Sequence, residues 1–460
     1  MLIARPSRRR PSHFRRRRGG SRQRGFTLTE LLITLFVVAE ILVAASLLFD
    51  VHNELARVQT NVANMQQSLR GAQRDMVAKV RMAGRGGVPA QLPTGPSGGQ
   101  PISRGVAVSV TNNVGANVRI VPADTETAVV PGTDILRVRG IFENPIYQVV
   151  STALGASASL TLLPDDESPA TATSGTLQIN NPSPTGVPQD LEALAPLGVT
   201  PNPNLQRALM LVSPLDDTIY AVVPITNIAS VRSAVTGQLT QVTLTFATTS
   251  GTHNTSFRTL FTSSGNLPNN LTGVAFAGLL EEHVYYVREV RAIPGDATSE
   301  LTPKLSRAEL FPGTNVPLSV ERGKIDVADN VIDFQVALGF NSSLQGYFDQ
   351  SQLEQLVITE TADGQNDDWL YNSTADADSS SPWVGPWAPV PGTPMPELNY
   401  VRLSTLARTD RRDFQYISPP IGAIEDRVYG ESATPGSDAE RRDRMFRRRL
   451  LQTVVDLRNL

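Results

Sequence analysis

Cysteine is absent from the sequence, and histidine occurs only four times among its 460 residues. Without cysteine the chain cannot build disulfide frameworks, thiolate metal sites or a cysteine nucleophile. The absence does not fix the cellular compartment, because an exported protein can fold without disulfides. The scarcity of histidine argues against a His-rich metal centre. We therefore expect no metal centre and no cofactor.

The motifs of common enzyme classes are missing too. The sequence has no Gly-x-Ser-x-Gly elbow, no His-Glu-x-x-His pair and no phosphate loop of the Walker type. His283 lies in a strand-like pattern beside Tyr285 and Tyr286, which favours a structural role. The adjacent carboxylates Glu281 and Glu282 are of a kind that arises by chance among 44 acidic residues. We expect no catalytic residue, and a secreted enzyme with a retained anchor is the least favoured alternative.

Acidic residues are missing from residues 1–25, which contain ten arginines. The whole chain has 41 Lys and Arg against 44 Asp and Glu, a net charge of −3. Without residues 1–25, 31 basic residues face 44 acidic ones, which gives −13. A basic N-terminal block on an acidic body indicates a tail with its own function. A tail that binds nucleic acid or anionic lipid is one alternative, but membrane topology explains its position better.

Residues 26–49 form an apolar run without Lys or Arg. As a helix, 24 residues extend about 36 Å, enough to cross a hydrocarbon core of about 30 Å. The arginines before the run predict that residues 1–25 stay in the cytoplasm and that the body crosses the membrane. A secretory signal peptide cut near Ser46 is the rival interpretation. Against it, the small residue Gly25 precedes the apolar run, and the acids Glu30 and Glu40 interrupt it.

The segment Arg24-Gly25-Phe26-Thr27-Leu28-Thr29-Glu30-Leu31-Leu32 resembles the class III signal of type IV pilins and type II secretion pseudopilins. The resemblance implies that residues 1–25 are a leader peptide. A prepilin peptidase would cut after Gly25 and methylate the new N-terminal residue, Phe26. Glu30 then occupies the fifth mature position, where the family keeps a glutamate that acts in assembly.

Elementary electrostatics supports an assembly role for Glu30. A buried carboxylate needs a cationic partner, and in a staggered helix bundle Glu30 would meet the N-terminal amine of Phe26 in a neighbouring subunit. The alternative is that Glu30 extends to the membrane interface. Glu40 lies ten residues further, about 15 Å along a helix. It either pairs with another subunit or is protonated in the membrane, and both options stay open.

The apolar pattern continues beyond residue 49 with mostly alternating steps of four and three, which predicts a helix over residues 26–83 with one apolar seam. Its amphipathic continuation is residues 50–87, which ends at Gly84, Gly86 and Gly87. We expect the seam to pack on a globular head; a coiled coil with another subunit is the alternative. The seam consists of Val51, Leu55, Val58, Val62, Met65, Leu69, Ala72, Met76 and Val80.

Proline is missing between residues 26 and 88. Most major pilins of the resembled family carry a helix-breaking proline near mature position 22, where this sequence has Leu47. The difference favours a minor pilin or a pseudopilin.

Residues 88–460 contain short β-branched runs between turn residues, which predicts a β-rich pilin head. The expected fold class is α+β: a pilin-like lollipop with a long N-terminal helix, transmembrane in its first half, packed on an antiparallel β-rich globular head. Two segments rich in Ser, Pro and Asn or Asp, residues 155–204 and 363–397, are predicted to be loop insertions. Strands are expected at 105–110, 134–139, 208–212, 218–224, 241–246, 283–291, 330–338, 400–406 and 453–457.

The body adds a weaker resemblance, to the PilW family of pilus-assembly proteins. Residues 131–138 look like an early strand of that family, and residues 283–288 and 305–307 like its paired-Tyr strand and the Leu-x-Arg strand that follows. Residues 327–339 and 447–459 resemble its Phe-Gln-Val segment and its closing strand with Leu-Arg-Asn. The segments keep the order of the family along the chain.

One predicted insertion combines acidic and aromatic residues. Asp363, Asp367 and Asp368 offer oxygen ligands of the kind Ca²⁺ prefers, but the spacing departs from the EF-hand order, which favours a solvated acidic turn. All three tryptophans lie nearby. They form either a self-packed loop or an exposed recognition surface that contacts a neighbouring pilin or an external target. The tryptophans are Trp369, Trp383 and Trp387.

A basic run near the C-terminus contains Arg441, Arg442 and Arg447–Arg449. It is expected to pair with carboxylates of the acidic body rather than with nucleic acid, which is not expected as a partner of the mature protein.

These observations predict a PilW-like minor prepilin that takes part in type IV pilus assembly and priming near the filament tip. The expected partners are a prepilin peptidase, other minor and major pilins, the inner membrane and the pilus assembly platform. The expected location is the inner membrane, with one span and a periplasmic head, and then the pilus on the cell surface. The alternatives are a J-like pseudopilin of type II secretion and a pilus-tip adhesin that uses the Trp/Pro-rich loop.

Overall fold

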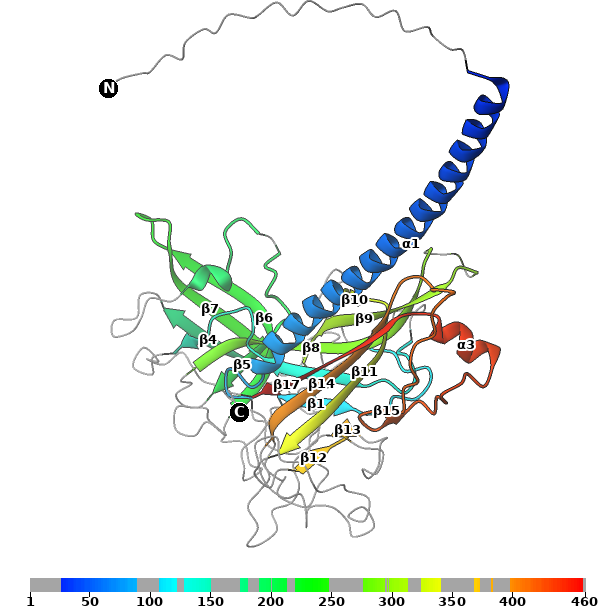
Figure 1. The fold of residues 1–460 in the computed structure, drawn as a ribbon. Helices are drawn as coiled ribbons and strands as arrows, with labels where there is room; N and C mark the ends of the chain where they lie inside the picture. The colour runs from blue at the N-terminus through cyan, green and yellow to red at the C-terminus, as the bar shows by residue number, and fades with distance from the viewer. Residues whose placement is uncertain are drawn as a thin grey trace, which may run out of the picture. The chain divides into compact units, whose positions relative to one another are not determined.

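The computed structural model describes residues 26–88, 107–121, 128–149, 174–180, 190–199, 201–212, 220–247, 276–293, 296, 298–312, 324–340, 368–372, 382–383 and 398–457. A long N-terminal helix, α1 (Leu28–Arg81), is followed by antiparallel strands (Figure 1). The expected α+β class, with an apolar helix and a β-rich head, is therefore confirmed. The chain divides into two compact units, Met1–Gln59 and Thr60–Leu460. We call the second unit the head.

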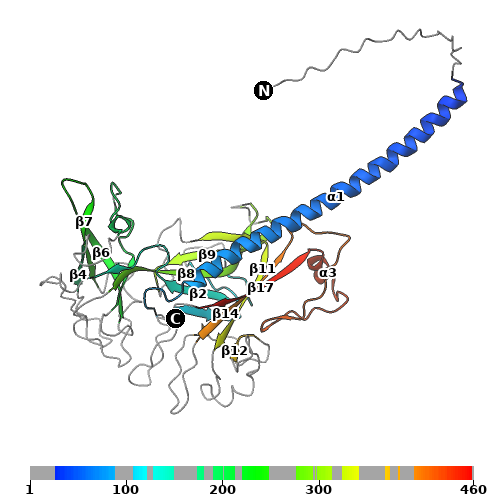
Figure 2. The same ribbon diagram turned by 60° about the vertical axis from the view of Figure 1, so that its left-hand side comes forward.

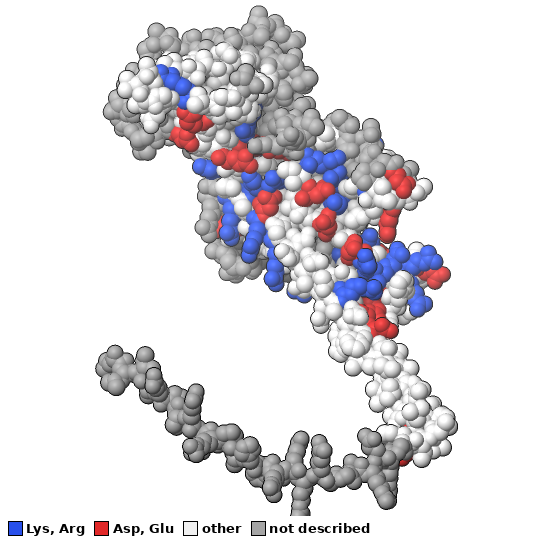
Figure 3. Space-filling view, turned by 90° about the horizontal axis from the view of Figure 1, so that it is seen from above, with Lys and Arg blue, Asp and Glu red and all other residues white. Residues whose placement is uncertain are grey.

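The first unit contains the N-terminal part of α1, which is the only helix of the described residues that is long and apolar enough to cross a membrane. Its large apolar side chains are exposed, among them Leu31, Phe36 and Ile41 at 58–62 %. Figure 3 shows this part of α1 almost without charged side chains. An exposed apolar surface on all sides of a helix is typical of a segment that lies in lipid or among other apolar helices.

Within the head, α1 buries one stripe of side chains. Met65, Leu69, Ala72, Met76 and Val80 are at most 7 % exposed and belong to the main hydrophobic core. Their spacing of three and four residues places them on one face of the helix. The predicted packing of the seam on the head is thus confirmed from Met65 onward.

The end of α1 is set by glycine. Gly84 and Gly86 have φ angles of 77° and 100°, which a side chain would strain. The amide of Gly84 donates to the carbonyl of Arg139 at 3.0 Å. Directly after the helix, the chain therefore contacts the strand that contains Arg139. The helix ends at Arg81, two residues earlier than predicted.

The larger sheet has the strand order β13-β1-β2-β8-β5-β6-β7-β4, and β8 also pairs with β3 and β9, which in turn pairs with β10. All described pairings are antiparallel. The strands are β1 (Val108–Thr111), β2 (Ile135–Gly140), β3 (Tyr147–Gln148), β4 (Ser174–Asn180), β5 (Ala208–Val212), β6 (Tyr220–Arg232), β7 (Leu239–Ala247), β8 (Phe276–Arg291), β9 (Leu301–Leu310), β10 (Ile325–Asp329) and β13 (Pro382–Trp383).

A second, four-stranded sheet has the order β12-β11-β14-β17. In Figures 1 and 2 its strands β11, β14 and β17 lie beside the head part of α1. The chain also forms a small β15–β16 hairpin, a 3₁₀ turn η2 and a short helix α3. The bounds are β11 (Val331–Phe340), β12 (Asp368–Leu370), β14 (Leu398–Arg408), β15 (Ala423–Ile424), β16 (Arg427–Val428), β17 (Arg448–Asp456), η2 (Leu191–Ala193) and α3 (Asp438–Arg444).

The head contains two large apolar cores that share strands β5 and β8. The main core joins α1 to both sheets, and the second lies among β4–β7, η2 and the first residues of β8. Twelve consecutive residues of β8, Ala277–Arg288, are buried, because both faces of this strand are covered. We call the part of the head around the second core the β4–β7 lobe.

All nine predicted strands overlap observed ones. The two predicted insertions are not loop throughout, since residues 155–204 contain β4 and η2, and residues 363–397 contain β12 and β13. In β4 the buried Leu177 and Ile179 alternate with polar residues. Ser, Thr and Asn around two apolar residues gave a composition typical of a loop, while pairing with β7 makes the segment a strand.

Candidate processing and assembly site

The residues around the predicted cleavage point form the start of α1. The amide and the hydroxyl of Thr27 both donate to Oε2 of Glu30 at 3.0 Å, and the Glu30 amide donates to Oγ1 of Thr27 at 3.3 Å. This reciprocal arrangement is a capping box, which satisfies backbone amides that the first helical turn leaves without a partner. Thr27-Leu28-Thr29-Glu30 therefore fixes where the helix begins. Sequence reasoning missed Thr27, although the Thr-x-x-Glu spacing was its signal.

The capping box places Glu30 within one helical turn of Phe26, whose side chain is 80 % exposed. Gly25, the other residue of the predicted cleavage point, lies outside the described residues. Only Oε2 of Glu30 takes part in the cap, so Oε1 is open to another donor. The same carboxylate is thus able to cap its own helix and to receive an ammonium group.

Glu40 is exposed on α1, ten residues after Glu30. At 3.6 residues per turn, the two side chains are about 80° apart around the helix axis. A single neighbouring helix that faces Glu30 therefore does not face Glu40 equally well. A partner for Glu40 stays a prediction.

Within the head, α1 is held on the larger sheet by a polar contact that the sequence analysis missed. Asp75 accepts from the hydroxyl of Tyr285 at 2.8 Å and from Nη1 of Arg307 at 2.6 Å. Burial and the nearby Asp75 carboxylate raise the pKa of Tyr285 well above its ordinary value, so the phenol stays protonated and donates. Because β8 supplies Tyr285 and β9 supplies Arg307, this contact fixes the register of α1 on two paired strands.

Two buried glutamates lie on β8 beside His283. Glu282 binds Arg137 at 2.7 Å and Arg139 at 2.6 Å, while Glu281 binds Arg207 at 2.9 Å. Both glutamates are 0 % exposed. Their pairing is therefore a property of the fold rather than of chance adjacency, since charges this deep are retained only with partners. Arg137 and Arg139 come from β2, so the cluster holds β2 against β8.

The predicted binding loop is not assembled as one surface by the described residues. Trp369 is 3 % exposed, with the guanidinium of Arg402 at 4.6 Å from its ring and the ring of Tyr400 at 6.4 Å. Trp369 therefore does not fit the exposed-surface alternative, because β12 aligns it with Gly339 of β11, where the lack of a side chain leaves room for the indole.

The other residues of that prediction are only partly described. Asp368 pairs through its backbone with Phe340 in the second sheet, and Trp383 pairs with Val110 in the larger one. Asp363, Asp367 and Trp387 lie outside the described residues. In the part of the chain that the structure describes, no group of three His, Asp or Glu side chains is arranged to hold a metal ion.

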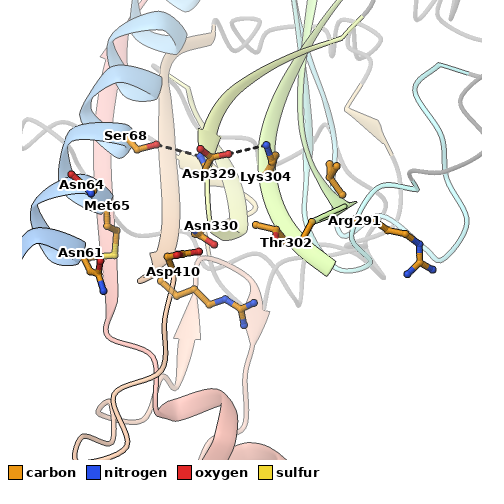
Figure 4. A pocket seen from close by; sticks show the side chains of 13 residues that line it. Asn61, Asn64, Met65, Ser68, Arg291, Thr302, Lys304, Asp329, Asn330 and Asp410 are labelled. Carbon is orange, nitrogen blue, oxygen red and sulfur yellow. Dashed lines mark hydrogen bonds and ion pairs between the residues drawn. The ribbon is translucent and has the colours of Figure 1, made fainter. Parts of the chain in front are cut away.

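A cavity of about 590 Å³ opens between α1 and the strand ends of both sheets within the head (Figure 4). Its wall combines polar and apolar side chains and charges of both signs. Asp329 joins its sides, since its amide donates to Oγ of Ser68 at 3.2 Å and its carboxylate binds Nζ of Lys304 at 3.0 Å. The cavity is lined by Asn61, Asn64, Met65, Ser68, Val290, Arg291, Ala292, Thr302, Lys304, Asp329, Asn330, Arg408 and Asp410.

The basic run near the C-terminus is partly neutralised inside the head. Arg447 binds Asp413 at 2.9 Å, and Arg448 binds Glu431 at 2.6 Å and also Asp443. The prediction that this run pairs with carboxylates of the body is confirmed for these two residues. Arg441, Arg442 and Arg449 are exposed instead.

Comparison with known proteins adds one finding. Residues 20–46 match the prokaryotic N-terminal methylation motif, a segment that includes the Gly25–Phe26 junction, Glu30 and Glu40. Searches among curated proteins and among solved structures gave no significant match. The motif supports a type IV pilin-like or pseudopilin protein, processed by a prepilin peptidase and associated with the membrane and with pilins. The single apolar helix fits a protein anchored by one membrane span.

Proposed function

We propose that this chain is a PilW-like minor prepilin, cut after Gly25, methylated at Phe26 and built into a type IV pilus at or near its tip. The observation that carries the proposal is the N-terminal methylation motif at residues 20–46, which joins an arginine-rich leader to an apolar helix. The protein would prime assembly through helix and charge pairing, with no reaction of its own.

Topology supports the first part of the proposal. Ten arginines precede an apolar segment that has no basic residue, an asymmetry that retains the leader in the cytoplasm. The head then folds on the other side, in the periplasm. The absence of cysteine is compatible with that compartment, since the head has two apolar cores to stabilise it.

The assembly role is assigned to Glu30 and Phe26. After cleavage, the amine of Phe26 is the nearest cation to Glu30 within the apolar segment. The capping box leaves Oε1 of Glu30 open, which suits pairing with the Phe26 amine of a neighbouring subunit. Such a pair neutralises two charges in a medium of low dielectric constant and fixes the axial register of the helices.

A minor role is favoured over a major one by the form of α1. The helix runs from Leu28 to Arg81 without the proline that most major pilins of the resembled family carry. A J-like pseudopilin of type II secretion shares this feature and is the closest alternative. The adhesin hypothesis is weakened by the burial of Trp369 and depends on residues such as Trp387.

Processing is tested by co-expressing the full chain with a prepilin peptidase and measuring the N-terminus by mass spectrometry. We expect loss of residues 1–25 and a methyl group on Phe26. Gly25→Leu is the matched control and should stay uncut, since the family cuts after glycine. An intact N-terminus in the unmodified chain, or cleavage near Ser46, would overturn the proposal.

A further inference from the structure

Between β14 and β17 the chain leaves the second sheet over residues 409–447, a segment that includes β15, β16 and α3. Exposed arginines lie at both ends of this segment and at the start of β17. Figure 3 shows Lys and Arg side chains gathered over this part of the head, where α3 lies. We call the group the arginine patch; it consists of Arg411, Arg412, Arg441, Arg442 and Arg449.

Three acidic residues near the patch are committed to other arginines. Asp413 binds Arg447 at 2.9 Å, Glu431 binds Arg448 at 2.6 Å, and Glu440 is 3.3 Å from Arg444. These pairs form the framework of the segment, because Arg444 and Phe446 are buried. Their carboxylates are therefore unavailable to the patch.

The patch itself lacks strong partners. Arg411 is 3.9 Å from Asp410, but both side chains are more than 65 % exposed, where an ion pair contributes little. Arg412 lies over the ring of Phe446 at 5.2 Å. Among the described residues, Arg441, Arg442 and Arg449 form no ion pair. The patch thus presents five exposed arginines, with the exposed Asp438 and Asp443 of α3 beside them, on a chain whose residues 26–460 carry −13.

Apolar side chains accompany the charges. Phe414 is 80 % exposed and Ile417 is 42 % exposed, both within six residues of Arg411. Exposed aromatic and aliphatic groups beside arginines are typical of surfaces that lie at a membrane interface. Arginine suits this role because its planar guanidinium binds phosphate oxygens through two hydrogen bonds.

The position of the patch within the head also favours a membrane. Asp410, next to Arg411, lines the same cavity as Asn61 and Asn64, which belong to the first turns of α1 inside the head (Figure 4). The patch therefore lies at the end of the head where the chain enters it.

We propose that the arginine patch docks on the anionic phospholipid headgroups of the membrane that holds residues 26–49. The inference rests on the proposed membrane anchor. Tethering gives the headgroups a high effective concentration at the patch, which a nucleic acid or a soluble acidic protein lacks. Docking holds the head at the membrane surface until the subunit leaves it for the filament.

The absence of cysteine permits a direct test with one label. Gln415 is exposed beside Phe414, and a fluorophore attached to Gln415→Cys reports how close this part of the head is to the bilayer. The full chain is reconstituted into vesicles of phosphatidylcholine alone or of phosphatidylcholine with phosphatidylglycerol. The readout is energy transfer to an acceptor on the lipid headgroups. We expect more transfer with phosphatidylglycerol, and a loss of that increment at high salt.

Two double variants with the same charge change distinguish an effect of the patch from an effect of the protein's net charge. Arg441→Gln/Arg442→Gln removes two patch arginines. Arg70→Gln/Arg74→Gln removes two exposed arginines of α1 and is the matched control. Each basic residue near an anionic surface contributes about 1 kcal/mol, so the loss of two arginines should lower the docked-to-free ratio about thirtyfold. The control should keep the ratio of the parent protein.

Flotation of the vesicles distinguishes an error in the proposed membrane anchor from an error in the proposed docking of the arginine patch. If the chain does not float with phosphatidylcholine vesicles, the proposed anchor is wrong. If it floats but the label gives the same transfer with and without phosphatidylglycerol, the docking proposal alone is overturned. It is equally overturned if both double variants reduce the transfer alike, or if duplex DNA binds the patch while phosphatidylglycerol has no effect.

Discussion

Glu30 combines two functions in one side chain. It closes the capping box with Thr27 at the start of α1, and it is the proposed partner of a neighbouring Phe26 amine. The two functions separate by mutation, because Thr27→Ala removes the cap and keeps the carboxylate, while Glu30→Gln keeps much of the cap and removes the charge.

We predict that Glu30→Gln is processed normally but is not incorporated into pili, since the neighbouring amine stays unpaired in an apolar medium. Thr27→Ala should retain incorporation. The measurement is the amount of cleaved subunit in the membrane and in sheared pili. Equal loss of incorporation in both variants would show that helix capping, rather than charge pairing, is what assembly requires.

Asp426 is a second residue whose environment decides its behaviour. It lies in the turn of the β15–β16 hairpin and accepts from the side-chain amides of Asn112 and Asn113. Burial, with a smaller contribution from the nearby carboxylates Glu425 and Asp333, raises the pKa of Asp426 from 3.8 to about 6. Near neutral pH the Asp426 carboxyl is therefore ionised, although its site favours the protonated form.

Linkage gives the sign of the resulting pH dependence. Because the folded pKa is above the unfolded value, the folded head takes up a proton first as the pH falls from above 6 towards 3.8. The stability that this group contributes is therefore fully present below pH 3.8 and is lost as the pH rises through about 6. We predict that Asp426→Asn removes this part of the pH dependence of the melting temperature. Asp410→Asn, at a side chain 68 % exposed, is the control and should leave the profile unchanged.

At the scale of elements, α1 is one helix with two different environments. Its large apolar side chains up to Leu55 are exposed, while those from Met65 onward contribute to the main core. The first part is suited to contact with lipid or with other subunits. The second part packs on the strands of the head. The Asp75 contact with Tyr285 and Arg307 belongs to the second part.

We predict that this division appears in stability measurements on the isolated protein in detergent. Met76 is 1 % exposed, so Met76→Ala should lower the free energy of unfolding by about 2–5 kcal/mol through lost burial and a cavity. Leu55 is 52 % exposed, so Leu55→Ala should change it by less than about 0.5 kcal/mol. A large effect of Leu55→Ala would mean that the head also packs on that part of the helix.

The whole molecule joins an anchoring signal to a head with two cores. The main core includes α1, whereas the β4–β7 lobe has its own core of residues such as Leu177, Ile179 and Phe246. Strand β8 contributes residues to both cores and so links the lobe to the part of the head that packs on α1. The β4–β7 lobe therefore adds surface to the head that is not needed to pack α1 or the second sheet.

Membership of a pilus or of a secretion system is a property of the whole molecule and its partners. We predict that a deletion strain loses surface pili while it still secretes proteins through the type II pathway, and that the intact gene restores piliation. Piliation is measured by shearing and microscopy, and secretion by the proteins in the culture medium. Normal piliation with lost secretion would assign the chain to the pseudopilin class instead.

The processing signal was predictable because it is local. Gly25, Phe26 and Glu30 lie within six residues, and their pattern is visible without any fold. The start of α1 was equally local, although its Thr-x-x-Glu cap was not recognised. Strands with alternating or continuous β-branched runs, such as β5 and β11, were predicted for the same reason.

Contacts between distant segments were not predictable in this way. Asp75 and Arg307 are 232 positions apart in the sequence, and neither stands out in its own surroundings. The burial of Trp369 could not be read from the sequence, because it depends on the pairing of β12 with β11 and not on the Pro-rich composition around it. The same holds for β4, whose polar sequence becomes a strand only beside β7.

The linear order of residues was therefore sufficient for the anchor, its polarity and its processing signal, because a membrane responds to runs of apolar and charged residues along the chain. The arginine patch is different. Its arginines are brought together only by folding. The fold also pairs the neighbouring acids Glu440, Asp413 and Glu431 with Arg444, Arg447 and Arg448. Which charges stay free on a protein surface depends on packing, since each ion pair joins groups that the sequence holds apart.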